Sequence, residues 1–234
     1  MFLLTNFFFL HIVSRLSHTV TVLAGQLSIP ELPDLVQHFL YQQENPESLI
    51  PLGTVPLDIC PTLSRTKVYV YLSAIATYFA PSDKSGTRGM FWECICAVDS
   101  WRKGPPRHDC VFVEQDSDLE GFCGLLVARI WSFLSIQHNK VSYPCALVSW
   151  YLAIGNQPCP NTKMWKVQPD LENLGQPILD IIQLDTILCN AHLIGVCNGT
   201  TWLPYNFRCH DSLDSFKAFY VNKYIDYHAH EITF

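Results

Sequence analysis

Apolar residues in the first half of the chain follow a helical spacing and then a strand spacing. Residues 30–43 repeat apolar side chains every three or four positions, which predicts a short amphipathic helix. Pro30 and Pro33 lie near its start, where proline is tolerated. Residues 67–79 are β-branched and aromatic and predict a strand, followed by a turn over residues 80–86. The expected buried face of the helix consists of Leu32, Leu35, Val36, Phe39 and Leu40.

From Asp109 onward, short apolar runs alternate with turn residues, as is typical of an all-β region. Residues 212–224 return to helical spacing, which predicts a C-terminal helix with Ser212 as its N-cap. The expected fold class is α+β, mainly β: a small antiparallel β barrel or sandwich with flanking N- and C-terminal helices. The predicted strands are residues 110–113, 125–136, 142–154, 164–167, 178–184 and 192–196.

The first 26 residues form an apolar segment of their own. Residues 1–13 resemble the hydrophobic part of a signal peptide, and Ala24-Gly25 is a candidate cleavage site. A basic start is missing, however, and Arg15 and His18 interrupt the stretch. The uninterrupted run is also too short to span a bilayer. We expect three parts: residues 1–26 outside the fold, residues 27–106 with the first helix, a loop and a strand, and residues 107–234 as a β-rich module with a C-terminal helix.

Composition limits the partners that the protein can have. The chain has 234 residues, of which 49% are hydrophobic, so a substantial core can form. Its formal charge of −6 argues against general nucleic-acid binding, which needs clustered Lys and Arg. The basic stretch at residues 101–108 lies in a Pro/Gly turn and favours a solvated loop. The ten cysteines predict disulfides if the chain is secreted, and otherwise free, mostly buried thiols.

Two groups of residues invite a metal-binding interpretation. Cys94 and Cys96 with His108 and Cys110 are soft zinc ligands, but only one residue separates the first pair, against the usual two to four. His228 and His230 lack a third placed ligand, and they are not four apart as in the metalloprotease motif. A third group, of alternating acidic residues, resembles a calcium-binding loop but lacks the glycine and the closing glutamate of an EF-hand. These acidic residues are Asp116, Asp118 and Glu120.

Catalytic interpretations are equally incomplete. Cys145 paired with His192 or His228 is conceivable as a cysteine hydrolase, yet Cys145 lies within a predicted strand, where a buried structural thiol is expected. A carboxylate set of Asp170, Asp180 and Asp185 has no motif that places its members together. Asn198-Gly199-Thr200 is a glycosylation sequon that matters only if the chain is secreted. The sequence therefore predicts no catalytic residue, no metal ligand and no cofactor-binding residue, and the protein is not expected to be an enzyme.

Several stretches resemble the C-terminal segment of fungal transposable-element proteins of the Plavaka transposase type. In that family the segment lies downstream of the transposase domain with its catalytic carboxylates. The resemblance therefore implies a non-catalytic accessory or interaction module with protein or chromatin as its partner. The β-rich part is also similar in style to bromo-adjacent-homology modules, which bind peptides and chromatin. The matching stretches, within about Leu27 to Phe234, are residues 74–83, 107–113, 143–148, 184–187, 191–196, 218–226 and 228–231.

The departures from the family also carry information. The resemblance implies arginine at six positions where this chain has cysteine or tryptophan, and a single C-to-T change in a CG-starting arginine codon produces both. We therefore expect a decaying element copy, with most of these positions at the surface or its boundary. Restoring six arginines would change the charge from −6 to about neutral. The six positions are Trp92, Cys94, Cys96, Cys123, Trp131 and Cys189.

A second interpretation belongs to another class. A secreted, disulfide-bonded glycoprotein would use residues 1–24 as its signal peptide, whereas an element-derived module would stay in the nucleus or cytoplasm. No later segment has the length and hydropathy of a membrane span, so a membrane partner is not expected. Secretion predicts that most of the ten cysteines lie within bridging distance of one another. The element origin predicts scattered, mostly unpaired thiols.

Overall fold

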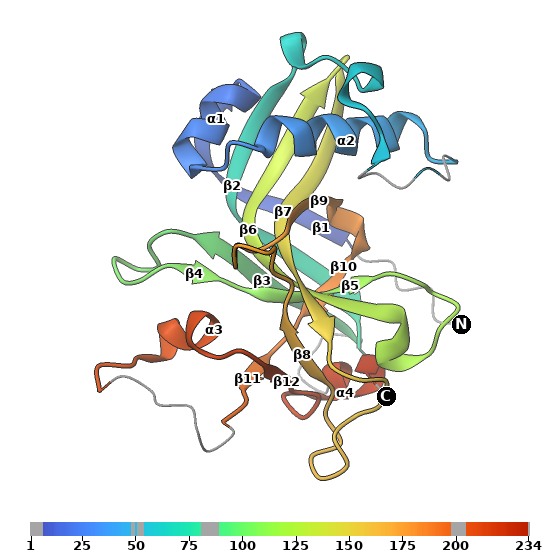
Figure 1. The fold of residues 1–234 in the computed structure, drawn as a ribbon, viewed down its shortest axis with the longest axis vertical. Helices are drawn as coiled ribbons and strands as arrows, with labels where there is room; N and C mark the ends of the chain where they lie inside the picture. The colour runs from blue at the N-terminus through green and yellow to red at the C-terminus, as the bar shows by residue number, and fades with distance from the viewer. Residues whose placement is uncertain (1–6, 48–49, 51–53, 81–88, 198–204, 234) are drawn as a thin grey trace.

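The chain folds into mainly antiparallel β structure with short helices at its flanks (Figure 1). This computed structural model describes residues 7–47, 50, 54–80, 89–197 and 205–233, of which residues 7–18 are described as backbone alone. The helices are α1 (Val20–Leu27), α2 (Leu32–Glu44), α3 (Ser212–Ser215) and α4 (Tyr227–Thr233). The strands are β1 (Phe7–His18), β2 (Lys67–Phe79), β3 (Met90–Val98), β4 (Arg107–His108), β5 (Cys110–Glu114), β6 (Leu125–His138), β7 (Val141–Ala153), β8 (Lys166–Pro169), β9 (Leu179–Gln183), β10 (Ile187–Asn190), β11 (Leu193–Gly195) and β12 (Phe219–Val221).

The hairpin of β6 and β7 is the centre of the sheet. Its two strands pair over most of their length, and the chain turns at Asn139 and Lys140, both in the left-handed region with φ of 48° and 69°. A two-residue turn of this kind matches the right-handed twist of antiparallel strands. The strand order is β11-β12-β8-β7-β6-β2-β3-β4; off this path, β1 pairs with β2, β5 with β6, β10 with β5, and β9 with β7. The path does not close on itself, so the predicted β region is confirmed in its sandwich-like form.

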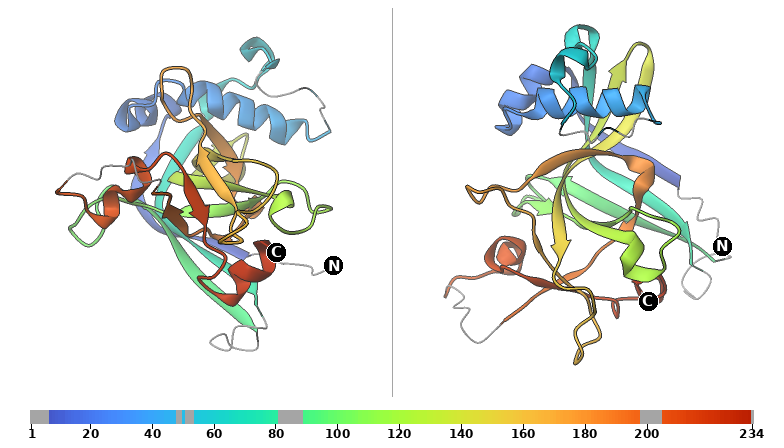
Figure 2. Two further views of the ribbon diagram at one scale, coloured as in Figure 1. Left: turned by 60° about the horizontal axis from the view of Figure 1, so that its bottom comes forward. Right: turned by 45° about the vertical axis from the view of Figure 1, so that its right-hand side comes forward.

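Two apolar clusters stabilise this arrangement. The larger one lies among the strands and contains the fully buried rings of Phe112, Phe133 and Phe219. The smaller one lies beneath α1 and α2, which cover one end of the long strands β2, β6 and β7 (Figures 1 and 2). The predicted helix over residues 30–43 is confirmed as α2. It buries Leu32 and Leu40 completely, which contributes about 1.5–3 kcal/mol for each side chain.

The predicted boundary at residue 26 needs correction. β1 pairs with β2 from Phe7 opposite Thr77 to His18 opposite Val68, and α1 buries Leu23 in the smaller cluster. The physical reason is that β2 exposes a full edge of backbone hydrogen-bonding groups, and an apolar run long enough to pair along that edge covers it. The described part of the first 26 residues therefore belongs to the fold.

The predicted C-terminal helix over residues 212–224 also needs correction. Only α3 is helical, and its N-cap is Asp211 instead of Ser212. Phe219 and Tyr220 instead pair in β12 with β8 on one side and β11 on the other. Pairing on both edges outweighs the helical spacing of the aromatic residues, because each ladder satisfies backbone hydrogen-bonding groups. The same strand also buries the Phe219 side chain. The strands β3, β4 and β10 were not predicted.

Candidate functional site

An irregularity in β6 forms one wall of a pocket. The pairing of β6 with β7 slips by one residue between Ile130 and Ser132, so Trp131 is an extra residue without a partner on β7. Such a β-bulge re-aims the side chains around it. The core-facing residues are accordingly Ile130 and Phe133, three positions apart instead of two. The Arg129 guanidinium carbon lies 4.8 Å from the Trp131 ring centroid, so the two side chains stack together.

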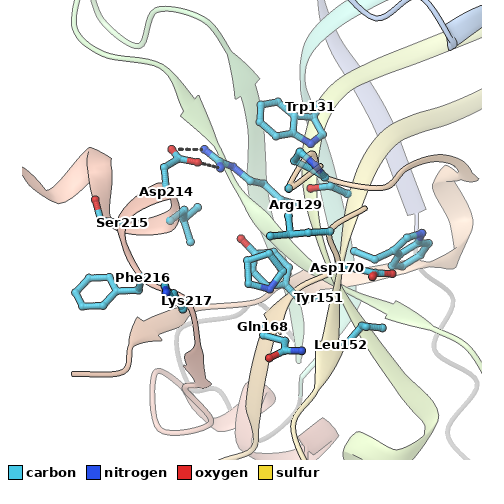
Figure 3. A pocket seen from close by; sticks show the side chains of 17 residues that line it. Arg129, Trp131, Tyr151, Leu152, Gln168, Asp170, Asp214, Ser215, Phe216 and Lys217 are labelled. Atoms are coloured by element: carbon cyan, nitrogen blue, oxygen red, sulfur yellow. Dashed lines mark hydrogen bonds and ion pairs between the residues drawn. The ribbon is translucent and has the colours of Figure 1, made fainter. Parts of the chain in front are cut away.

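Arg129 is a buried cation in β6, a strand whose buried side chains are mostly apolar. It is 9% exposed, and its two terminal nitrogens donate to the two carboxylate oxygens of Asp214 at 2.5 and 3.3 Å (Figure 3). Burial alone lowers the pKa of Arg129, but the hydrogen bonds and charge of Asp214 outweigh burial and raise that pKa. The Asp214 side chain itself is 63% exposed. The cation is therefore fixed inside the protein, while its counter-ion lies at the surface.

The pocket beside Arg129 has a volume of about 760 Å³, within the range of about 300–1,000 Å³ typical of small-ligand sites. Its walls come from β6, β7, β8, the loop over residues 170–177 and the C-terminal segment over residues 213–217. In the view of Figure 3, the Arg129 side chain crosses from β6 to Asp214, with Trp131 on one side and Tyr151 on the other. The aromatic lining consists of Trp131, Trp150, Tyr151 and Phe216.

Two donors on this wall lack acceptors. Arg129 Nε and Trp131 Nε1 are buried and have no hydrogen-bond partner in the part of the chain that the structure describes. More than nine-tenths of buried polar groups in proteins are paired, and an unpaired one costs about 1–3 kcal/mol. Both residues line the pocket. The wall therefore combines a fixed positive charge, two buried N–H groups without an acceptor, and aromatic surfaces.

Three titratable groups close to Arg129 stay uncharged: His108, Tyr151 and Cys110. His108 packs against Trp131 with 5.2 Å between ring centroids, and burial followed by the charge of Arg129 lowers the pKa of His108. Burial, followed by the neighbouring Cys110, raises the pKa of Tyr151. Burial likewise raises the pKa of Cys110 to about 12. At neutral pH the imidazole, the phenol and the thiol are therefore all in their neutral forms.

The C-terminal segment is held against the pocket by a close approach at Gly195. A Cβ atom at Gly195 would lie 2.4 Å from the Phe216 ring, a contact that real side chains do not make. Phe216 also packs edge-on against Phe219, with 6.2 Å between ring centroids. Because Gly195 has no side chain, the Phe216 ring can lie against its backbone. This contact keeps Phe216 in the pocket wall and Asp214 within reach of Arg129.

The structure does not bring the proposed zinc ligands together. The Sγ atoms of Cys94 and Cys96 lie 3.9 Å apart. His108, however, packs on Trp131, and Cys110 hydrogen-bonds to Tyr151. No group of three or more His, Cys, Asp or Glu side chains among the described residues has the geometry to hold a metal ion.

The proposed cysteine–histidine pairs are also apart. Cys145 is fully buried in the cluster beneath α1 and α2, and burial raises the pKa of its thiol. His228 instead stacks on Tyr78 at 4.2 Å between centroids. His192 is exposed and contacts Asn222. Neither histidine therefore shares the surroundings of Cys145.

The acidic residues singled out from the sequence occupy separate places. Asp170 lines the pocket of Arg129, whereas Asp180 accepts a hydrogen bond from Trp150 Nε1 at 3.3 Å. Asp185 is exposed in a single 3-10 turn. In the loop after β5, Asp116 accepts from the backbone N–H of Asp118, which stabilises a turn. The sequon at residues 198–200 lies outside the described residues.

Comparison with known proteins adds no family to this picture. No protein-family model, no curated protein and no solved structure matches the chain. None of the helices in the described part of the chain is long and apolar enough to cross a membrane.

Sequence reasoning did not identify this pocket. In the sequence, Trp131 is singled out only as a position where the resemblance implies arginine, and Arg129 and Asp214 are not singled out at all. One signal was present: Arg129 is the single charged residue in the apolar run over residues 125–136. A charged side chain inside a strand that is apolar on both faces needs a partner, and such residues are rarely buried without a role.

Proposed function

We propose that this chain is a non-catalytic interaction module derived from a fungal transposable element, and that the pocket beside Arg129 binds a segment of a partner protein. The observation that carries the binding proposal is the pair of unpaired donors, Arg129 Nε and Trp131 Nε1, in an aromatic-lined pocket. Backbone carbonyls and side-chain oxygens of a peptide are suitable acceptors. Aromatic residues and arginine are also the side chains that dominate protein recognition sites.

The proposed origin draws support from the surroundings of Cys189. This thiol is buried, and its pKa is raised by burial and then by the nearby carboxylates of Glu93 and Asp226. Burial also raises the pKa of Glu93, which accepts hydrogen bonds from Asn190. None of the ion pairs within the described ranges includes Glu93. An arginine at position 189 would therefore have two carboxylates as counter-ions, as expected if the cysteine replaced it.

The other departures divide by burial. Trp92 and Cys123 are exposed, and Cys94 and Trp131 are half-buried, as expected for former arginine positions. Cys96 is buried, like Cys189. Position 96 lies beside a further carboxylate, because Asp109 accepts a hydrogen bond from the Cys96 backbone N–H. Even the buried positions therefore have acidic neighbours.

The state of the cysteines favours the element origin over the secreted alternative. All ten cysteines lie among the described residues, and all ten are free thiols. The secreted interpretation requires that most of them pair. Three of the five buried ones, Cys110, Cys145 and Cys189, instead pack as small apolar side chains within the two clusters.

Selection from a random peptide library tests the binding proposal. The immobilised protein would be the bait, and selected peptides would be measured against the Arg129→Met variant. We expect binding to weaken by at least about tenfold, because the substitution removes the charge and the Nε donor while keeping the volume. Arg102→Met is the matched control, since Arg102 is exposed in the turn between β3 and β4. Peptides that bind both variants and the original protein equally would contradict the proposal.

A pair of cysteine substitutions tests the origin. Cys189 and Cys145 are both fully buried, but only Cys189 has carboxylate neighbours. We expect Cys189→Arg to remain folded, whereas Cys145→Arg buries an unpaired charge and unfolds the protein. Equal destabilisation of both variants, measured by thermal unfolding, would count against arginine as the former residue. A transposase reading frame upstream of the gene would support the same origin from the genomic side.

A further inference from the structure

The Arg129–Asp214 pair is asymmetric, and this asymmetry indicates the chemistry of the ligand. Arg129 is 9% exposed and sits on the central hairpin of the sheet, so it cannot leave its position. The side chain of Asp214 is 63% exposed and lies on the four-residue α3. Rotation of the Asp214 side chain returns its carboxylate to water at little cost. The same rotation would leave a buried guanidinium without a counter-ion, which is strongly unfavourable.

Any group that displaces Asp214 must therefore bring a negative charge of its own. The charged residues that line the pocket are Arg129 and Lys217, balanced by Asp170 and Asp214. With Asp214 turned outward, the lining carries one net positive charge, which suits a monoanion. A phosphate, with nearly two negative charges, would exceed the single net positive charge left by Arg129, Lys217 and Asp170. A carboxylate matches this balance better.

The unpaired donors fit the same ligand. A carboxylate has two oxygens and about four lone-pair directions, more than the two terminal nitrogens of Arg129 fill. Arg129 Nε and Trp131 Nε1, the two donors that lack partners within the described residues, are buried while Asp214 is in place, so an entering carboxylate would accept from them only after Asp214 has turned outward. Asp214 uses only the terminal nitrogens. The ligand carboxylate would therefore form hydrogen bonds that Asp214 does not.

We infer that the pocket takes the carboxylate of a glutamate or aspartate that stands beside an aromatic residue in a partner peptide, and that Asp214 occupies the place of this carboxylate in the unbound protein. The aromatic neighbour packs on the walls formed by Trp150 and Phe216. Asp214 thus acts as a built-in competitor for the ligand. This inference rests on the proposed function, because it names the ligand of the same pocket.

The competition predicts that removing the Asp214 charge strengthens binding. The probes are dye-labelled, blocked peptides of sequence Gly-Phe-Glu-Gly, Gly-Phe-Gln-Gly and Gly-Phe-phosphoserine-Gly, measured by fluorescence polarisation. We expect the glutamate peptide to bind Asp214→Asn at least about fivefold tighter than the original protein. The glutamine peptide should bind both weakly and equally, because an amide cannot replace the missing charge.

Two further measurements make the result decisive. Asp214→Ser removes the possibility that the asparagine amide imitates the carboxylate, and thermal unfolding verifies that both variants are folded. Unchanged or weaker binding of the glutamate peptide to both variants would overturn the inference. So would tighter binding of the phosphoserine peptide than of the glutamate peptide to the original protein. If library-selected peptides still depend on Arg129 while neither Asp214 variant gains affinity, the inference fails and the proposed function stands.

Discussion

Truncation of a single side chain in α1 shows whether the N-terminal segment belongs to the fold. Leu23 is 1% exposed and packs in the cluster beneath α1 and α2. Leu23→Ala removes buried methyl groups and leaves a cavity, and such substitutions cost about 2–5 kcal/mol. Val22 precedes it on the same helix but is 50% exposed. Val22→Ala should change the stability by no more than about 0.5 kcal/mol.

Thermal unfolding followed by circular dichroism measures the difference between these two variants. At about 2–4 °C per kcal/mol for a chain of this size, Leu23→Ala should lower the midpoint by about 4–20 °C and Val22→Ala by about 2 °C or less. The comparison is internal, because both changes shorten an aliphatic residue in the same helix. Equal and negligible shifts would show that α1 does not pack on the sheet, and the original expectation that residues 1–26 lie outside the fold would then hold.

Three further predictions concern the thiols, a buried histidine and the six positions where the proposed origin implies arginine. Iodoacetamide at neutral pH should modify Cys159 before the other cysteines, because hydrogen bonds from Thr162 and Asn161 lower the pKa of its thiol to about 6. Cys145 is buried and should react only when the protein unfolds. Mass spectrometry of samples taken at early times measures this order of modification. Burial lowers the pKa of the His228 imidazole below its ordinary value of 6.5, so as the pH falls the unfolded chain takes up a proton before the folded chain does. The contribution of neutral His228 to the free energy of unfolding is therefore complete above about pH 6.5 and is lost as the pH falls through the pKa of the folded protein. The unfolding midpoint should therefore drop less between about pH 7.5 and pH 5.5 in His228→Phe than in the original protein, and equal drops would exclude this histidine as the cause. Reversion of all six departures to arginine should leave the protein folded, more soluble and able to bind DNA in a salt-sensitive way; an unfolded product would sink the decay hypothesis.

The strands were predictable where local residue preference and tertiary pairing agree. The β-branched and aromatic run at residues 67–79 coincides with β2, and the apolar run at residues 125–136 lies within β6. The helix α2 was predictable for the same reason, since its apolar face repeats at helical spacing. In these elements the local pattern and the buried face are the same residues.

The remaining elements depend on contacts that the sequence does not display. The aromatic residues between Phe216 and Tyr224 have helical spacing, yet Phe219 and Tyr220 pair in a strand because β8 and β11 each leave an edge to cover. The pocket could not be predicted from the sequence for a related reason. Asp214 meets Arg129 across 85 positions of the chain, and the bulge at Trp131 that turns the wall toward it has no signature in the sequence.

The most direct test of the binding site observes its two unpaired donors themselves. Arg129 Nε–H and Trp131 Nε1–H each give a side-chain signal in a proton–nitrogen correlation spectrum, and the Arg129→Met and Trp131→Phe variants assign these two signals. Titration with a library-selected peptide should move both signals downfield and in parallel, because each donor gains an oxygen acceptor. The indole signals of the five other tryptophans, out of six in the chain, provide the reference. A saturable shift of Arg129 Nε–H and Trp131 Nε1–H supports the account, whereas peptide binding that leaves both signals in place would contradict it.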